Sequence, residues 1–328
     1  MRFIWNRSPQ HAVESMLVVC GLVSIVAVAQ EYPTRAIRMV LPFPAGGGSD
    51  LVARIIAQKY AQLLGQQVIV DNRAGASGNI ASEIVAKAPG DGYTILFANS
   101  SMSISPAIYK SLSYDPVKDF TAVSMASSYP FALVAHPALP VKNVKDLIAL
   151  ALAKPNALDY SSAGTGTMSH MAMEMLRVKT GANITHLPYK GALPSTVALL
   201  TGDCQVSFVV MPVAAPNINA QRLRGLGVAA KTRAAIIPNV PTMEEAGVKD
   251  HVALQWNGLF VPSKTPANIQ DRLYRDWVLA LKAPDVIQKI RAEGAEPVGN
   301  TTAEFSAFYK AETLKWADVA KRSGTKVD

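Results

Sequence analysis

Short β-branched runs alternate with amphipathic helical segments along most of this chain, and the alternation occurs twice. In the first set, helices lie between predicted strands, with strands at 37–41, 68–70 and 93–98 and helices at 50–64 and 79–88. The second set repeats this order, with strands at 158–161, 184–187, 206–210 and 223–228 and helices at 169–180 and 193–201. Such alternation is typical of βαβ units and a mainly parallel sheet. The sequence therefore predicts two α/β lobes.

Two β-like runs, 120–125 and 131–134, lie between the sets and are separated by Ser127–Pro130. From Pro266 onward the chain is predicted to be helical in three pieces broken by prolines. We expect the second lobe to be inserted in the first, with long crossover strands joining them. The predicted limits are 30–123 with 226–328 for the first lobe and 124–225 for the second.

The N-terminus has the three parts of a secretory signal peptide. Two arginines precede an almost wholly apolar run over residues 16–28, which ends in the small-residue cleavage box Ala27-Val28-Ala29. The run is shorter than the ~18–20 residues of a membrane-spanning helix, which disfavours an uncleaved anchor. The bulky valine before Cys20 disfavours a lipid anchor. We predict that residues 1–29 are removed and that the mature chain is periplasmic.

The charge pattern argues against a nucleic-acid partner, and the cysteine content argues against a disulfide. The net charge is +8, but the basic residues are scattered and aromatic residues make up 7% of the chain. No basic, aromatic stripe for nucleic acid is therefore present, and the charge fits a solvated surface that steers anions mildly. Only Cys204 remains after processing, so an internal disulfide is excluded, and we expect no cofactor.

Two strand-to-helix turns carry the candidate binding chemistry. The first is PFPAGGGSD at 42–50, and the second is SSAGTGTMSH at 161–170. Glycine lets the backbone approach a ligand closely, and the helix N-terminus that follows presents unpaired N–H groups and a partial positive charge. Ser49 or Asp50 can cap the first helix. If the two turns face each other across a cleft, they predict an anion site. The alternative for the turn at 42–50 is a tight glycine-rich turn that binds no ligand.

Helix ends alone do not hold a micromolar ligand. Each contributes about 0.3–1 kcal/mol to anion binding, up to ~2 when partly buried, whereas micromolar affinity needs roughly 8 kcal/mol. Hydroxyl groups and enclosure must supply the remainder, which favours lobes that close. The segment Asn99–Ser103 either adds hydroxyls at the same mouth or is a polar surface loop.

Catalytic motifs are absent from the sequence. It contains no G-x-S-x-G, no H-E-x-x-H and no paired zinc cysteines, and the first turn lacks both the P-loop lysine and G-x-G-x-x-G spacing. His136, His170 and His186 are isolated in sequence. His170, on the first turn of a helix, either contacts the ligand or has a capping role.

Several segments resemble the Bug family, the tripartite tricarboxylate transporter receptors of proteobacteria. They run in family order along nearly the whole mature chain: YP at 32–33, PFPAGG at 42–47, VDNRAGASG at 70–78, PGDGYT at 89–94, YDPVKDF at 114–120, LPYKG at 187–191, VPTMEEAG at 240–247 and WNGLF at 256–260. The resemblance implies a type II periplasmic-binding-protein fold, in which two α/β lobes close on a ligand like a flytrap. It also implies a monomeric, non-enzymatic receptor that delivers a small carboxylate to a two-subunit membrane transporter.

In similar proteins the ligand carboxylate lies between the loops that match 43–50 and 162–170. The candidate ligand-binding residues in these loops are Phe43, Ala45, Gly46, Gly47, Ser49, Asp50, Gly164, Thr165, Gly166, Thr167, Ser169 and His170. Ser100 and Ser101 are added for the distal end of the ligand, and Val209 for the position after Phe208.

Many relatives have an aspartate after the phenylalanine that matches Phe208, whereas this chain has Val209. An aspartate there can pair with the ammonium of an amino acid and a valine cannot. Unless Val209 is merely a buried strand residue, we expect an aromatic or aliphatic mono- or dicarboxylate without an amino group. Two other functions stay open: an exported enzyme on the same fold, and a sensory receptor for a signalling protein.

Overall fold

The computed structural model describes residues 32–327. The predicted signal peptide and the mature start at Gln30 lie outside the described residues. Within 32–327, no helix combines the length and the apolar character that a membrane crossing requires.

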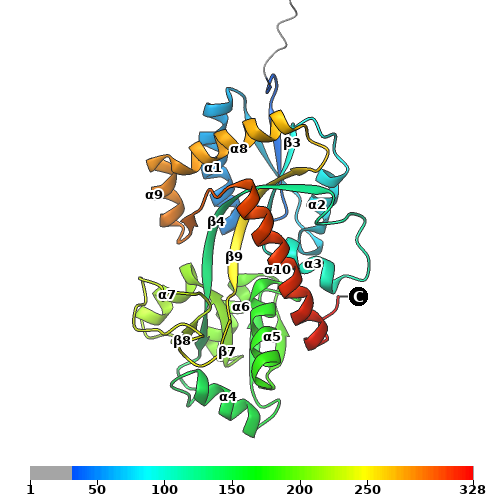
Figure 1. Ribbon diagram of the computed structural model, residues 1–328. Coiled ribbons are helices and arrows are strands. Elements are labelled where there is room, and N and C mark those ends of the chain that lie inside the picture. The colour runs from blue at the N-terminus through cyan, green and yellow to red at the C-terminus, as the bar shows by residue number, and fades with distance from the viewer. Residues whose placement is uncertain (1–31, 328) are drawn as a thin grey trace, which may run out of the picture. The chain divides into compact units, whose positions relative to one another are not determined.

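The first α/β set forms a parallel sheet, as predicted. Its strands run in the order β2, β1, β3, with bounds Val68–Asn72, Ile37–Leu41 and Thr94–Asn99. The helices that connect and follow them are α1 (Gly48–Leu64), the 3-10 turn η1 (Ala76–Gly78), α2 (Asn79–Ala86) and α3 (Ser101–Ile108). We call this part of the chain, with its covering helices, the first lobe (Figure 1).

A single long strand carries the chain out of the first lobe. β4 (Phe120–Ala135) pairs antiparallel with β9 (Leu254–Pro262) over its first part, and β9 in turn pairs with β3. From Phe131 onward β4 pairs with β7 and β8 instead. The prediction of two separate strands was therefore wrong, because Pro130 interrupts the apolar pattern but not the strand.

The second α/β set forms the second lobe around the far end of β4. Its strands are β5 (Asp159–Ser162), β6 (Thr185–Pro188), β7 (Val206–Val210) and β8 (Arg224–Val228). Its helices are α4 (Val144–Ala153), α5 (Met168–Thr180), α6 (Ala192–Thr201) and α7 (Met211–Asn219). β5 lies between β6 and β7 and is parallel to both. The predicted lobe limits at 124 and 225 fall inside β4 and β8, and that division of the chain stays a proposal.

The C-terminal region is helical in three pieces, as predicted. They are α8 (Ala267–Lys282), α9 (Pro284–Ala292) and α10 (Thr302–Ser323), with the short strand β10 (Glu296–Pro297) between the last two. Helix α10 begins at a capping box formed by Thr301 and Glu304. Its first half, with Phe305 and Tyr309, packs in the first lobe, and its second half, with Trp316, packs against α5 in the second (Figure 1).

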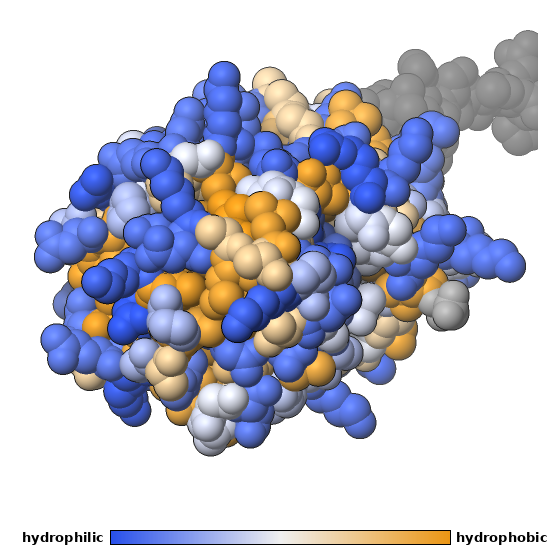
Figure 2. Space-filling view, turned by 90° about the horizontal axis from the view of Figure 1, so that it is seen from below, coloured by the Kyte–Doolittle hydropathy of each residue, from blue (hydrophilic) through white to orange (hydrophobic). Residues whose placement is uncertain are grey.

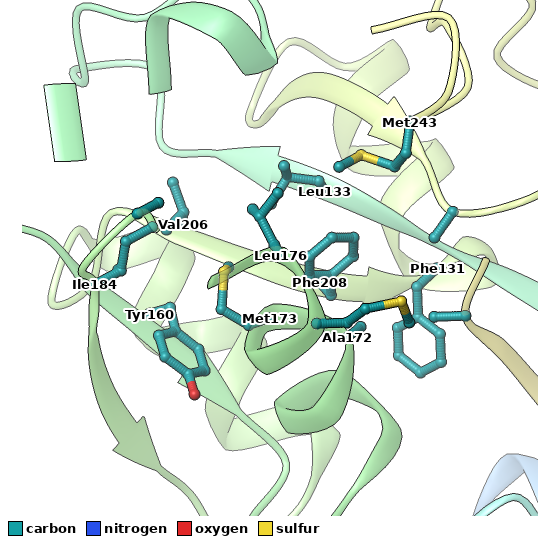
Figure 3. Close-up of a cluster of buried hydrophobic side chains, with 14 of the residues drawn as sticks. Phe131, Leu133, Tyr160, Ala172, Met173, Leu176, Ile184, Val206, Phe208 and Met243 are labelled. Carbon is teal, nitrogen blue, oxygen red and sulfur yellow. The ribbon is translucent and has the colours of Figure 1, made fainter. Parts of the chain in front are cut away.

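The core of the second lobe is built from alternating strand residues and one face of α5. Figure 3 shows Leu133 of β4, Phe208 of β7, and Met173 and Leu176 of α5 gathered in this cluster. All four are almost fully buried. Apolar side chains also reach the surface, among them Leu152 of α4 and the pair Leu193 and Val197 of α6. On the face shown in Figure 2, apolar residues gather near the middle and hydrophilic residues surround them.

Candidate functional site

A cavity of about 490 Å³ lies at the carboxyl ends of strands from both lobes. Tyr129 and Phe131 of β4 and Gln255 of β9, at the crossover between the lobes, form part of its wall. A volume of this size is typical of small-molecule sites, which span roughly 300–1,000 Å³. Residues of both lobes therefore line one cavity that is large enough for a small ligand.

Several helices begin at this wall. They are α1 at Gly48, α3 at Ser101, α5 at Met168, α6 at Ala192 and α7 at Val210–Pro212. At α3, Ser101 N already donates to Asn99 Oδ1 (3.0 Å), whereas the starts of α1, α5, α6 and α7 have no side-chain hydrogen bond from an N-cap residue. The first N–H groups of a helix have no partner within the helix, and its N-terminus carries a partial positive charge. The helix starts at the wall thus direct N–H donors and positive potential toward one space.

The side chains on the wall are mostly apolar, with hydroxyl groups among them. Phe43, Phe131, Phe208 and Val209 supply apolar surface, and the hydroxyl residues are Ser49, Ser101, Tyr129, Thr167, Ser169, Ser195, Thr196 and Ser207. Among residues 32–327, no lysine, arginine or histidine lines the cavity. An anion here would be held by N–H and hydroxyl donors in an apolar surround, where hydrogen bonds are stronger than in water.

Asp50 fixes the first turn rather than lining the cavity. Its carboxylate accepts hydrogen bonds from Gly46 N (2.9 Å), Arg54 Nε (3.0 Å) and Asn72 Nδ2 (2.8 Å). Burial alone would raise the pKa of Asp50, but these hydrogen bonds outweigh it and hold the pKa below its ordinary value. The same Asn72 amide also donates to Phe43 O (2.9 Å). The turn is therefore tied to both α1 and β2 before any ligand arrives.

The second turn is held by hydrogen bonds among its own residues. Thr167 Oγ1 donates to Gly164 O (2.7 Å), and Ala163 N donates to Ser169 Oγ (3.0 Å). Thr167 Oγ1 and Ser169 Oγ lie 3.1 Å apart. Because the Thr167 side chain bonds backward to the turn, it does not cap α5 and leaves the helix start open to the cavity.

Stacked rings lie directly under this turn. His170 stacks on His186 with ring centroids 4.1 Å apart, and His186 stacks on Tyr160 at 4.7 Å. Gly166 N donates to His170 Nδ1 (3.1 Å), which leaves Nε2 as the protonated nitrogen, and His186 Nε2 lies 2.6 Å from Ser162 Oγ. Tyr160 Oη donates to the buried Glu174 (2.5 Å). The ring stack thus supports two residues of the turn from below.

Acidification should destabilise the protein through this ring stack. Burial, together with the nearby Arg177, lowers the pKa of His170 to about 4. Burial, together with His170 and Arg177, lowers the pKa of His186 to about 3. An unfolded chain takes up these protons near pH 6.5, so between about pH 6.5 and 4 the unfolded state binds more protons and stability falls as the pH falls. For His170 alone the loss at about pH 4 is on the order of 3 kcal/mol.

Thermal unfolding of wild type and His170→Asn between about pH 7 and pH 4.5 checks this expectation. The asparagine Oδ1 stands near the position of Nδ1 and accepts from Gly166, but it does not titrate. The Tm of the variant should therefore fall less steeply over this range. Equal slopes in the two proteins would contradict a role for His170.

The predicted site residues fall into two groups. Phe43, Ser49, Ser101, Thr167, Ser169 and Val209 line the cavity. The others stand behind the wall or outside it: Ala45, Gly46, Gly47, Asp50, Ser100, Gly164, Thr165, Gly166 and His170. Ser101 begins α3, and Ser100 and Ser103 are fully buried, so the alternative of a polar surface loop at Asn99–Ser103 was wrong.

Sequence reasoning missed the wall contributed by α6, α7, β4, β9 and the residue that follows α9. Two signals pointed to the first two helices, since Gly191 precedes α6 and Pro212 lies in the first turn of α7. Tyr129, Gln255 and Glu293 have no local signal, because they reach the cavity only through tertiary structure.

Comparisons with known proteins agree with this architecture. Residues 52–325 match the family model described as the tripartite tricarboxylate transporter family receptor. The chain is 36% identical to the protein in the tcbD-tcbE intergenic region of Pseudomonas sp. (strain P51), over 87% of this chain and 85% of that protein. It is 34% identical to BugT of Bordetella pertussis, over 96% and 98% of the two chains.

Solved structures of similar proteins share the fold. An R. palustris protein with adipate has a TM-score of 0.79 at 34% identity and covers 90% of this chain and 99% of its own. The periplasmic binding protein BugD has a TM-score of 0.77 at 30% identity, with coverage of 90% and 99%. MatC from Rhodopseudomonas palustris with malate has a TM-score of 0.77 at 29% identity, with coverage of 88% and 99%.

These structures confirm the predicted type II periplasmic-binding-protein fold, with two α/β lobes joined by crossover strands. The chain belongs to the family of tripartite tricarboxylate transporter receptors, the Bug proteins, whose members are periplasmic solute-binding proteins.

Proposed function

We propose that this receptor, acting as a monomer, captures a small carboxylate without an amino group and delivers it to a two-subunit membrane transporter of the tripartite tricarboxylate type. The observation that carries the proposal is the convergence of the helix starts α1, α3, α5, α6 and α7 on one apolar cavity. N–H donors at helix starts bind small anions, carboxylates among them, without a cationic side chain, and the apolar wall favours an organic one. Two relatives hold such compounds, namely adipate and malate.

The absence of an amino group from the ligand is supported by the second-lobe wall. Val209 and Val210 end β7 at the cavity, and the second lobe contributes no acidic side chain to the wall within residues 32–327. An ammonium group held against this part of the wall would lose its hydration without a charged partner from the second lobe, because Glu293, the one carboxylate on the wall among residues 32–327, comes from the first lobe. Phe43, Phe131 and Phe208 instead favour an aliphatic or aromatic body.

A thermal-shift screen of the mature protein from Gln30 onward tests the function. The compounds are mono-, di- and tricarboxylates, aromatic acids, amino acids and phosphate esters. A ligand at 100 times its dissociation constant adds about 2.7 kcal/mol to stability, so one carboxylate class should raise Tm clearly and be recovered unchanged. Tight binding of aspartate or glutamate, with no binding of carboxylates that lack an amino group, would contradict the proposal that the ligand has no amino group. Consumption of the ligand would favour an enzyme.

Closure of the lobes should depend on Gly294, which follows α9 in the first lobe. A Cβ atom at Gly294 would lie 2.6 Å from Pro212 Cγ and 2.8 Å from Pro212 Cβ, at the start of α7 in the second lobe. Real Cβ atoms do not approach so closely, so any side chain here must force α9 and α7 apart. Gly294→Asn should weaken binding of the screened carboxylate by about tenfold or more, because the lobes no longer close fully.

Asparagine is chosen because it tolerates the positive φ of Gly294 (+73°) better than other side chains. Gly65→Asn is the matched control: its φ is +70°, and a Cβ there meets nothing within 4 Å. Calorimetric titration of both variants checks the prediction. Equal affinities in the two variants would show that the contact with Pro212 is unimportant for closure.

A further inference from the structure

One charged side chain, that of Glu293, belongs to the cavity wall in the part of the chain that the structure describes. Glu293 follows the last turn of α9 and is half-buried. The nearby Arg291 is engaged elsewhere, with its Nε 3.0 Å from Glu296 Oε2. Since no basic residue among 32–327 lines the cavity, the negative charge of Glu293 is not offset on the wall.

Glu293 also stands beside one of the helix starts at the wall. Its neighbour Gly294 packs against Pro212 in the first turn of α7, and both Pro212 and Glu293 line the cavity. A helix N-terminus favours an anion. A carboxylate from the first lobe thus lines the same cavity as the α7 start, so a second ligand carboxylate near α7 would meet a like charge on the wall.

We propose that Glu293 determines selectivity for charge, so that the receptor takes ligands with one carboxylate and disfavours those with two. This inference rests on the proposed capture of a carboxylate. The first ligand carboxylate is held at other helix starts, and the apolar wall around Phe131 and Phe208 encloses the ligand body. A second carboxylate finds no cation in the cavity and is repelled by Glu293, and like charges within several ångströms in a partly buried site repel strongly.

Two pairs of probes vary the number of carboxylates on a common framework. Hexanoate and adipate share a six-carbon chain, and benzoate and terephthalate share a ring; each pair differs by one carboxylate. We expect the monocarboxylate of the better-bound pair to bind wild type more tightly by calorimetric titration. In Glu293→Gln, which keeps the side-chain size, the preference should shrink by about tenfold through tighter binding of the dicarboxylate.

Glu244→Gln is the control, because Glu244 is exposed and absent from the cavity wall, yet its loss changes the net charge equally. It should leave the preference unchanged. A wild type that binds the dicarboxylates as tightly, or a preference that Glu293→Gln leaves intact, would overturn the role of Glu293 while capture of a carboxylate stands. If neither these four probes nor any carboxylate of the thermal-shift screen binds wild type, carboxylate capture itself is overturned.

Discussion

Replacing Thr167 by aspartate should weaken carboxylate binding by at least 100-fold while leaving the protein as stable as wild type or slightly more stable. Thr167 is the N-cap residue of α5 and lines the cavity. Its backbone already has the extended conformation of an N-cap, with φ −77° and ψ 163°, but its side chain bonds to Gly164 O instead of the helix. An aspartate there caps the helix and complements its dipole, each effect worth about 0.5–1 kcal/mol.

The same carboxylate acts against the ligand. It takes up N–H groups at the start of α5 and places a negative charge on the cavity wall, where Ser169 and Met168 also lie. A carboxylate ligand would then meet a like charge in place of a hydrogen-bond donor. A loss of about 2.7 kcal/mol or more in binding free energy corresponds to the expected factor of 100. Stability and affinity should therefore change in opposite directions.

Thr167→Asn separates charge from shape in this experiment. Asparagine has the size of aspartate and caps helices equally well, but it is neutral. It should keep most of the affinity, while thermal unfolding shows the same or higher Tm for both variants. If the Thr167→Asp variant binds the carboxylate with the same affinity as wild type, the start of α5 is not part of the anion site.

Trp316→Ala should be the most destabilising single change in the C-terminal helix, with a loss of about 3–5 kcal/mol. Trp316 is fully buried in the second-lobe core although α10 begins in the first lobe. Its Nε1 donates to Glu312 Oε2 (2.8 Å), and Lys315 Nζ lies 4.4 Å from the centre of its ring. Alanine leaves a cavity and removes a partner from the buried Glu312 carboxylate, so both effects act in the same direction.

Leu314→Ala on the same helix is the control, because the Leu314 side chain is 73% exposed. Both substitutions truncate a large apolar side chain to alanine, so propensity effects on α10 are small in each. Denaturant unfolding should show a near-neutral Leu314 variant and a strongly destabilised Trp316 variant. Similar losses in the two would mean that α10 is not anchored in the second lobe by Trp316.

Local sequence patterns predicted most of the elements, and the failures have physical causes. Strands such as β1 and β7 lie where β-branched runs predicted them, because both are buried on two faces. α3 was missed because its serines and Pro106 resemble a loop. Its Ser103 and Ser105 hydroxyls bond back to the carbonyls of Ser100 and Ser101, which allows a serine-rich helix to be buried.

The sequence predicted only those site residues that lie in a recognisable local motif. The two glycine-containing turns follow strands and precede helices, and that order placed Ser49, Thr167 and Ser169 at the cavity wall in advance. Tyr129 and Glu293 reach the same cavity from a crossover strand and from the end of a helix. Nothing in their neighbouring residues indicates this, because the lobes must assemble before either side chain meets the cavity.

The pairing of β3 with β9 also determines the order in which the lobes can be completed. Leu96 of β3 pairs with Phe260 of β9. By contrast, β7 and β8, which pair with the far end of β4, are complete once the growing chain has reached Val228. A chain growing from its N-terminus thus has all the strands of the second lobe while β3 still lacks one neighbour. Contacts this distant in sequence form slowly, because a long loop must close first. The sheet that begins the protein is therefore the last to be finished, and one edge of β3 stays without a neighbour until β9 has been synthesised.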